Sequence, residues 1–131
     1  MIPLKIAEID HIVLRCADRE RALNFYIHVL GLIEERRLER LGLIQLRAGA
    51  GMIDLIPAES RDDAARNVEH FCLGIETDDM EIVMRHLREN AVEIVDGIGE
   101  RYGARGMGPS LYIRDPEGNI VELKQIPPDE R

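Results

Sequence analysis

The segment Ile9-Asp10-His11-Ile12-Val13-Leu14-Arg15 has a counterpart further along the chain, Val68-Glu69-His70-Phe71-Cys72-Leu73-Gly74. In both copies an apolar residue, an acid and a histidine precede a run of mostly apolar residues, and the two histidines are 59 positions apart. Similar segments at a fixed offset indicate two copies of one structural unit. We therefore expect His11 and His70 to occupy equivalent places, which a pseudo-twofold relation between the units could bring together.

The composition is that of a single water-soluble domain spanning residues 1–131. The 131 residues are enough for one ordinary core. No apolar run approaches the roughly 20 residues of a membrane span, and the N-terminus lacks the apolar stretch of a secretory signal. We therefore expect a cytoplasmic protein that does not engage a membrane.

The charge balance excludes one large class of partner. The formal net charge is -8 and the isoelectric point is about 5.0. Binding to phosphate backbones needs clustered lysine and arginine, so nucleic acid is not an expected partner. The two cysteines, Cys16 and Cys72, show no metal-binding pair spacing and receive no chemical role.

Hydrophobic periodicity predicts the order β-α-β-β-β in the first half of the chain. The first strand alternates so that His11 and Arg15 share a face. Asp18 is a suitable helix N-cap, and Gly31 suits the helix end. The predicted first unit covers residues 6–56, with strands at 8–15, 33–38, 43–47 and 52–56.

The same order returns after a polar connector at residues 57–67. The second helix is expected to begin after Thr77 or Asp78 and to end at Asn90, which lies 59 positions after Gly31 and also tolerates a left-handed cap. A glycine-rich excursion is predicted at 97–108 and a solvated tail at 127–131. The second unit covers residues 68–126, with strands at 68–75, 92–95, 111–114 and 120–125.

Alternation within the predicted strands separates an apolar face, directed toward the helices, from a chemically active face. The apolar face comprises Ile12, Leu14, Ile53, Leu55, Phe71, Leu73, Ile75, Leu111, Ile113, Val121 and Leu123. The alternate positions carry His11, Arg15, Asp54, His70, Ser110, Tyr112, Arg114, Glu122 and Lys124.

Each unit thus contributes one histidine from its first strand and one carboxylate from its last, His11 with Asp54 and His70 with Glu122. Both carboxylates lie among apolar neighbours and need a cation or a solvent-filled cavity. Two imidazoles and two carboxylates suit one divalent ion per site, with Ni, Zn, Mn, Co and Fe all compatible. Asp10 and Glu69 fall on the opposite strand face and are interpreted as surface acids.

Several motifs resemble those of the vicinal oxygen chelate superfamily, which includes glyoxalase I. These motifs are the histidine that opens each half, the helix segment Phe25-Tyr26 running to Val29-Leu30-Gly31-Leu32, and Asp115-Pro116-Glu117-Gly118-Asn119 leading into Ile120-Val121-Glu122-Leu123. The resemblance covers residues 6–126. It implies an α+β glyoxalase-like fold, in which two tandem βαβββ units form a paired, barrel-like curved sheet with the helices outside.

The resemblance to glyoxalase I also implies roles for individual residues. His11 corresponds to a metal ligand, Arg15 to a residue that helps hold glutathione, and Glu122 to a ligand that also moves the substrate proton. Asp54 departs from this pattern, since glyoxalase I usually has glutamate there. The implied function is a metal-dependent lyase or isomerase of glyoxalase I type, such as a lactoylglutathione lyase, acting on a small chelating oxygenated substrate, with a glutathione hemithioacetal as a candidate.

Other members of the superfamily offer alternatives. An epimerase acting on a thioester would use the same parts. A fosfomycin-type thiol transferase would bind phosphonate through the region of Ser110, Tyr112 and Arg114. An extradiol dioxygenase would need only His11, His70 and Glu122, and a drug-binding resistance protein would need no metal.

A homodimer is the expected assembly. The apolar positions Val13 and Met52 would be poorly covered in the half-barrel that one four-stranded unit makes. In such a dimer the sheets of two chains would complete each other. By resemblance to the superfamily each site would take ligands from both chains, and the alternative is a single chain whose two units close on each other to build one site.

Overall fold

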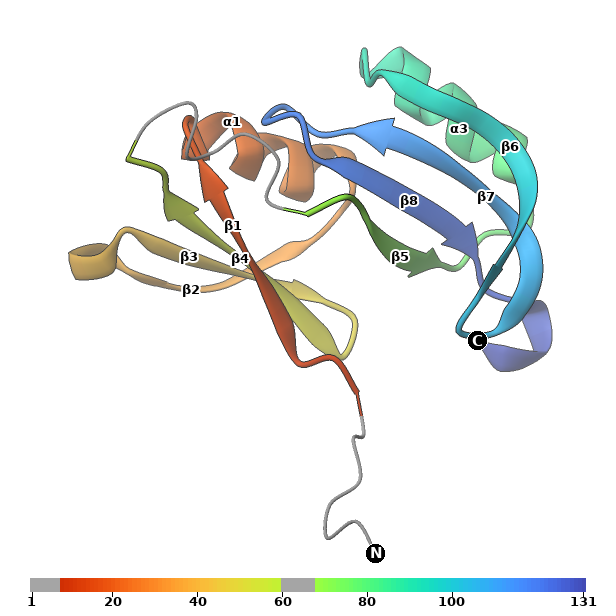
Figure 1. Ribbon diagram of the computed structural model, residues 1–131, viewed down its shortest axis with the longest axis horizontal. Coiled ribbons are helices and arrows are strands. Elements are labelled where there is room, and N and C mark those ends of the chain that lie inside the picture. Colours follow the sequence, from red (N-terminus) through yellow and green to blue (C-terminus); the bar gives the residue numbers. More distant parts are fainter. Residues whose placement is uncertain (1–7, 60–67) are drawn as a thin grey trace, which may run out of the picture. The chain divides into compact units, whose positions relative to one another are not determined.

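The computed structural model describes residues 8–59 and 68–131 (Figure 1). The chain divides into two compact units, Met1–Ala64 and Ala65–Arg131. Each unit contains one four-stranded sheet with mixed strand directions. The connector predicted at 57–67 lies largely outside the described residues.

The first unit has the predicted order β-α-β-β-β, and its sheet order is β1-β4-β3-β2. Strand β1 is parallel to β4, whereas β3 is antiparallel to both β4 and β2. The sheet is open, with β1 and β2 at its edges. The elements are β1 (His11–Cys16), α1 (Arg19–Asn24), a π-helix (Phe25–Val29), β2 (Ile33–Leu38), a 3-10 turn (Glu39–Leu41), β3 (Leu43–Ala48) and β4 (Gly51–Pro57).

The second unit repeats this architecture with the sheet order β5-β8-β7-β6. Strand β5 is parallel to β8, and β7 is antiparallel to β8 and β6. The elements are β5 (Phe71–Ile75), α3 (Met80–Glu89), β6 (Ile94–Gly103), β7 (Gly106–Arg114), β8 (Ile120–Gln125) and a 3-10 turn (Pro128–Glu130). The α+β class and the tandem βαβββ units are therefore confirmed, as two sheets that are each open.

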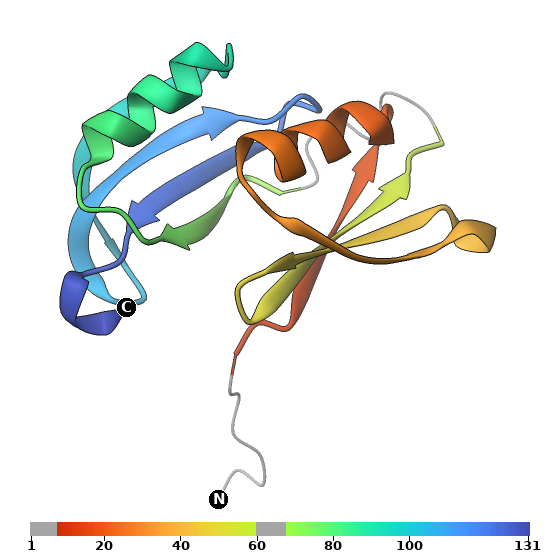
Figure 2. The same cartoon turned by 180° about the vertical axis from the view of Figure 1, so that it is seen from behind.

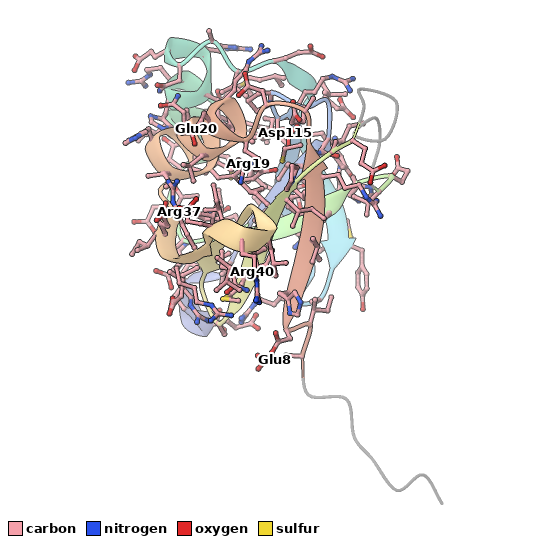
Figure 3. The ribbon with its side chains drawn as sticks, turned by 90° about the vertical axis from the view of Figure 1, so that its left-hand side faces the viewer. Glu8, Arg19, Glu20, Arg37, Arg40 and Asp115 are labelled. Carbon is pink, nitrogen blue, oxygen red and sulfur yellow. The ribbon has the colours of Figure 1, made fainter. Side chains whose placement is uncertain are left out.

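Each helix lies along its own sheet, α1 against β4 and α3 against β6 (Figure 2). In the first unit Ala22 and Tyr26 are fully buried with Leu14 and Leu55 of the sheet. Arg19 lies at the start of α1 (Figure 3). It donates a hydrogen bond to the carbonyl of Gly42 before β3. The second core contains Met84, Leu87, Leu111, Ile113 and Val121. The strand residues among them, Leu14, Leu55, Leu111, Ile113 and Val121, belong to the faces that alternation predicts as apolar.

The helix ends follow the predicted chemistry in the first unit and depart from it in the second. Asp18 caps α1 by accepting a hydrogen bond from the Arg21 amide at 3.1 Å, and Gly31 has φ 83°. The cap of α3 is Asp79, not Thr77 or Asp78, because the Thr77 hydroxyl instead contacts the Asp79 amide at 3.3 Å.

The helical part of the second unit also ends differently from the prediction. Asn90 ends α3, but it keeps φ -98°, and the left-handed residue is Ala91 with φ 57°. The Asn90 side chain donates to the His86 carbonyl at 2.9 Å, so the chain turns one residue later. The left-handed positions of the two units are therefore not separated by the offset of the histidines.

The predicted excursion at 97–108 is wrong, because these residues form most of a long hairpin. Strands β6 and β7 pair up to Gly103 and Gly106, and their register shifts between Ile94 and Asp96 and again between Asp96 and Gly99. Glycines hide the two-residue alternation that normally reveals a strand. The tail predicted at 127–131 is exposed from Pro128 onward, and within it Arg131 donates hydrogen bonds to the Ile126 carbonyl at 3.0 Å and the Asp78 carboxylate at 2.6 Å.

Candidate metal-binding and catalytic site

Strand register places the predicted histidine and carboxylate of each unit in the same relation. In the first unit Asp54 on β4 lies opposite Val13 on β1, two residues beyond His11. In the second, Glu122 on β8 lies opposite Cys72 on β5, two residues beyond His70. Residues two apart in a strand share a face, so each histidine is the diagonal neighbour of its carboxylate. We call these pairs the first half-site (His11, Asp54) and the second half-site (His70, Glu122).

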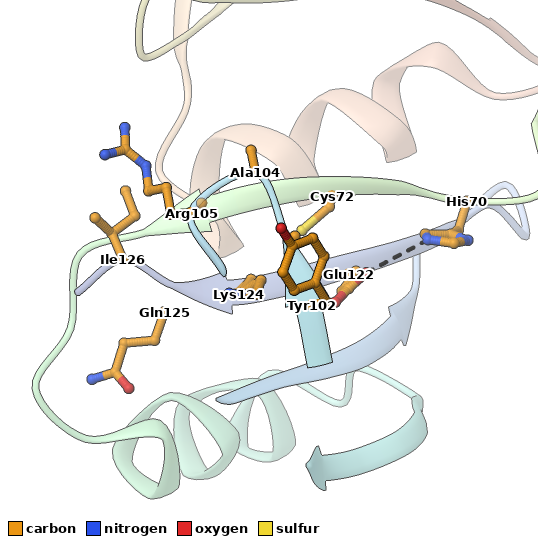
Figure 4. A pocket seen from close by; sticks show the side chains of 11 residues that line it. His70, Cys72, Tyr102, Ala104, Arg105, Glu122, Lys124, Gln125 and Ile126 are labelled. Atoms are coloured by element: carbon orange, nitrogen blue, oxygen red, sulfur yellow. Dashed lines mark ion pairs between the residues drawn. The ribbon is translucent and has the colours of Figure 1, made fainter. Parts of the chain in front are cut away.

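In the second half-site the histidine ring and the carboxylate lie within ion-pair distance of each other. The Nε2 atom of His70 lies 3.5 Å from Oε1 of Glu122 (Figure 4). The Glu122 side chain is 8% exposed and the His70 side chain 35%. The histidine therefore faces solvent at the rim while the carboxylate lies deeper.

The acidic residue that precedes each histidine contacts the Nδ1 atom of that histidine's ring. Asp10 Oδ1 lies 2.6 Å from Nδ1 of His11, and Glu69 Oε2 contacts Nδ1 of His70 in the same way. The hydrogen bond raises the pKa of His11, assisted by the charge of Asp54 and opposed by burial. A carboxylate at one ring nitrogen is the usual companion of a metal-binding histidine, because it fixes the ring and leaves the other nitrogen for the ion.

Asp10 and Glu69 are exposed, as predicted, but their contact with the histidine rings was missed. The signal was present, since an acid precedes the histidine in both copies of the repeat.

Asp54 is the most constrained carboxylate of the first half-site. It is 4% exposed, and its Oδ2 accepts a hydrogen bond from Gln45 Nε2 at 3.1 Å. Gln45 in turn accepts from Nε of Arg36 on β2. The other oxygen, Oδ1, is buried and accepts no hydrogen bond within residues 8–59 and 68–131. A buried carboxylate oxygen without a partner is costly and fits a position where a cation binds.

Tyr112 occupies the place beside Glu122 that Gln45 occupies beside Asp54. Tyr112 pairs with Glu122 across β7 and β8, and Gln45 pairs with Asp54 across β3 and β4. Burial, the charge of Glu122 and a hydrogen bond with it raise the pKa of Tyr112, so the phenol remains protonated. The Tyr112 ring meets the His70 ring edge-on at 5.3 Å.

A pocket of about 510 Å³ opens beside the second half-site (Figure 4). His70, Glu122 and Cys72 lie at one part of its wall, with Lys124 and the Gly103–Arg105 hairpin tip also lining it. Burial raises the pKa of the Cys72 thiol to about 11, with a further contribution from Glu122 that Lys124 opposes. The thiol is therefore uncharged at neutral pH.

The turn before β8 fixes the position of Glu122. Oδ1 of Asp115 accepts hydrogen bonds from the amides of Glu117 and Asn119 at 2.9 and 2.8 Å. Asn119 Nδ2 also donates a hydrogen bond to Oδ2 of Asp115 at 2.9 Å, and Gly118 adopts the left-handed conformation with φ 90°. This closed turn delivers the chain into β8 with Glu122 on the face opposite to the buried Val121 and Leu123.

The residues predicted to bind substrate lie in different environments. Arg15 is exposed on the same face of β1 as His11. Ser110 is fully buried, and its hydroxyl accepts from Arg101 at 3.2 Å. Arg114 contacts Glu93 and the Gly118 carbonyl, both at 3.1 Å. Of these four, Tyr112, Ser110 and Arg114 make contacts within their own sheet and its turns, and substrate binding by any of the four remains a prediction.

The residues present fit a divalent ion in their chemistry, through two imidazoles with oriented rings and a buried carboxylate oxygen without a donor. Within the described parts of the chain, no three His, Cys, Asp or Glu side chains gather closely enough to hold an ion. Each unit by itself supplies one histidine and one carboxylate. The role of all four residues as ligands of one ion therefore remains a prediction.

Comparison with known proteins decides the family. The sequence profile of the Glyoxalase/Bleomycin resistance protein/Dioxygenase superfamily matches residues 8–123. The chain belongs to this superfamily. It is 30% identical to Virulence protein STM3117 of Salmonella typhimurium over 129 residues, which cover 95% of this chain and 88% of that protein.

Two further relatives illustrate the range of the family. Glyoxylase I 4 of Arabidopsis thaliana is 27% identical and covers 92% of this chain and 72% of its own. The structure of integron cassette protein VCH_CASS1 of V. cholerae superimposes with a TM-score of 0.76 at 33% identity, covering 96% of this chain and all of the other. These similarities confirm the glyoxalase-like fold. None of the helices in residues 8–59 and 68–131 is long and apolar enough to cross a membrane.

Proposed function

We propose that the protein is a metal-dependent isomerase or lyase of glyoxalase I type. Its substrate is a small molecule with two neighbouring oxygens, and glutathione hemithioacetals are candidates. His11, Asp54, His70 and Glu122 are the proposed ligands of one divalent ion, and their chemistry is compatible with Ni, Zn, Mn, Co and Fe. The observation that carries the proposal is the buried Oδ1 of Asp54, which accepts no hydrogen bond from the described residues.

Glu122 is the proposed general base and acid. It is 6% exposed, lies at the wall of the pocket and contacts His70. Tyr112, which also lies beside Glu122, stays protonated, so its hydroxyl can donate a hydrogen bond to the Glu122 carboxylate. When bound, a divalent ion would stabilise the negative charge that develops on the substrate oxygens. Glu122 would move the proton between adjacent substrate carbons. Arg15 would hold an anionic group of the glutathione part of the substrate.

The test is the substitution Glu122→Gln, assayed with methylglyoxal and glutathione at saturating metal. Glutamine keeps the size and hydrogen bonding of the side chain but cannot accept a proton. We expect turnover to fall by about 10²- to 10⁴-fold, the usual contribution of general acid–base catalysis. Glu100→Gln is the matched control, because Glu100 is exposed on β6 and is predicted to leave turnover unchanged.

Other outcomes identify the alternatives. Full turnover by Glu122→Gln would end the proton-transfer proposal. Activity on fosfomycin with a thiol, or on a catechol, would assign the site to thiol transfer or to extradiol cleavage. Failure to bind any of the five metals would favour the alternative hypothesis of a metal-free drug-binding resistance protein.

A homodimer is part of the proposal. The edge strands of the first unit expose Val13 on β1 at 46% and Ile33 on β2 at 69%, and Ile9 before β1 is 80% exposed. Exposed apolar side chains at sheet edges favour association. Light scattering at micromolar concentration should give twice the chain mass, and the mass of one chain would contradict this assembly.

A further inference from the structure

A buried lysine lies beside the second half-site and has no role in the chemistry proposed above. Lys124 is 6% exposed on β8, two residues beyond Glu122 and on the same face of the sheet. Its placement is unusual for this chain, because Lys5 and Lys124 are the only lysines among 17 basic residues. Lysine is rarely buried unless its charge is paired.

Two glycines of the β6–β7 hairpin make room for this side chain. A Cβ atom at Gly103 would lie 3.1 Å from Cδ and 3.2 Å from Cε of Lys124, and one at Gly108 would lie 3.1 Å from Nζ. All three distances are shorter than most real Cβ contacts. Any larger residue at these positions would crowd the lysine, so the hairpin accommodates it closely.

The ammonium group is not neutralised by a neighbour in the described parts of the chain. No hydrogen bond or ion pair engages Lys124 within residues 8–59 and 68–131. Arg105, a second cation of the pocket wall, is already paired with Glu130 at 3.5 Å. Lys124 therefore brings an unpaired positive charge to a pocket that also contains His70 and Glu122.

We infer that Lys124 is an anion-binding subsite, which selects substrates carrying a carboxylate or a phosphonate next to the chelating oxygens. The inference rests on the proposed function, since it names the substrate class of the same site. With Glu122 engaged as a ligand, its negative charge is satisfied by the ion, and the nearby ammonium is left for the substrate. A buried ammonium without a counter-charge is costly, so an anionic group that pairs with it binds favourably.

Three hydroxamates that share a chelating group test this selection. Acetohydroxamate has an uncharged methyl end, succinomonohydroxamate carries a carboxylate, and phosphonoacetohydroxamate carries a phosphonate. Calorimetric titration of the metal-loaded protein should show tighter binding of at least one anionic compound than of acetohydroxamate. The tighter of the two anionic compounds identifies which group the subsite takes.

Substitution of Lys124 should remove the preference for anionic hydroxamates without weakening chelation itself. In Lys124→Met the Kd of the preferred anionic compound is expected to rise about 10- to 100-fold, the range for loss of a charge-assisted hydrogen bond. The Kd of acetohydroxamate should change less than about twofold. Lys5→Met is the charge-matched control and should keep the preference. An unchanged preference in Lys124→Met, or an equal loss for all three compounds, would overturn the inference.

A second measurement does not depend on bound metal. With lysine labelled at its side-chain nitrogen, the metal-free protein should give only two ammonium signals in the NMR spectrum, and Lys124→Met assigns them. Methylphosphonate or acetate should shift the Lys124 signal in a saturable way, and acetamide should not. Absence of any saturable shift would contradict the subsite even if the protein binds no metal, so this result separates the inference from the proposed function.

Discussion

The two half-sites share a backbone geometry but differ in what surrounds the carboxylate. In both, the histidine is the diagonal neighbour of the acid across a parallel strand pair. Asp54 is held by the Gln45 amide, which Arg36 supports. Glu122 instead lies beside the Tyr112 phenol, the Cys72 thiol and an open pocket.

This difference suggests a division of roles between two copies of one unit. Aspartate has one methylene fewer than glutamate, and the hydrogen bond from Gln45 restrains it further. Such a carboxylate suits a fixed ligand. Glu122 has a longer side chain beside a solvent-accessible pocket, which suits the general base proposed for it.

Among substitutions outside the four proposed ligands, the largest expected effect tests what the half-sites have in common, the acid that precedes each histidine. Asp10→Asn and Glu69→Gln should each weaken metal binding by about 10- to 100-fold, because the carboxylate no longer orients the imidazole. Competition with a chromophoric chelator measures the affinity.

Glu8→Gln is the control for these two variants. Glu8 is exposed near His11 in the sequence and is not seen to contact the ring. Its substitution should leave metal affinity unchanged. Wild-type affinity in both Asp10→Asn and Glu69→Gln would show that the acids do not orient ligands.

The next effect tests the difference between the half-sites. Gln45→Leu should lower the free energy of unfolding of the metal-free protein by about 1–3 kcal/mol, since it leaves Asp54 buried without its donor. Tyr112→Phe should lower it by less than about 1 kcal/mol, because Tyr112 is only half-buried and water can replace its hydroxyl. Urea denaturation measures both, and equal losses would remove the distinction between a fixed and an accessible carboxylate.

The smallest effect concerns Cys72, whose pKa is raised to about 11 by burial first and by Glu122 second. Because the folded-state pKa is raised, the thiol stays protonated below that value, and its alkylation by iodoacetamide should accelerate about tenfold per pH unit up to it. Glu122→Gln should increase the rate at pH 8 by less than about tenfold, since burial remains. Cys16 is 2% exposed and does not compete. A rate that Glu122→Gln leaves unchanged would show that Glu122 does not act on this thiol.

Much of the fold was predictable because its signals are local. Alternating strands, the Asp18 cap and Gly31 follow directly from side-chain chemistry. The part of the β6–β7 hairpin beyond the predicted strands at 92–95 and 111–114 was missed, because glycines carry no side chain to reveal alternation. The turn at Ala91 was misplaced because the Asn90 side chain caps a carbonyl instead of adopting the left-handed conformation.

Some features of the candidate site were also predictable from the sequence, and others were not. The repeat and strand alternation predicted that a histidine and a carboxylate of each unit share a face, and the strand register agrees with this placement. The contacts of Gln45 with Asp54 and of Gly103 with Lys124 could not be predicted, because they depend on strand register across residues far apart in the sequence. The enclosure of Ser110 behind Arg101 depends on the same long-range pairing.

The most direct test of the account is a calorimetric titration of the chelator-treated protein with Ni, Zn, Mn, Co and Fe, repeated for His11→Ala and His70→Ala. We predict about one ion per chain for at least one of these metals, and a loss of affinity in each variant greater than the about 100-fold attributed to an orienting acid. Equal losses in both variants would support one ion held by both half-sites. No binding of any metal, or binding that neither substitution weakens, would contradict the claim that the two half-sites together form a metal centre.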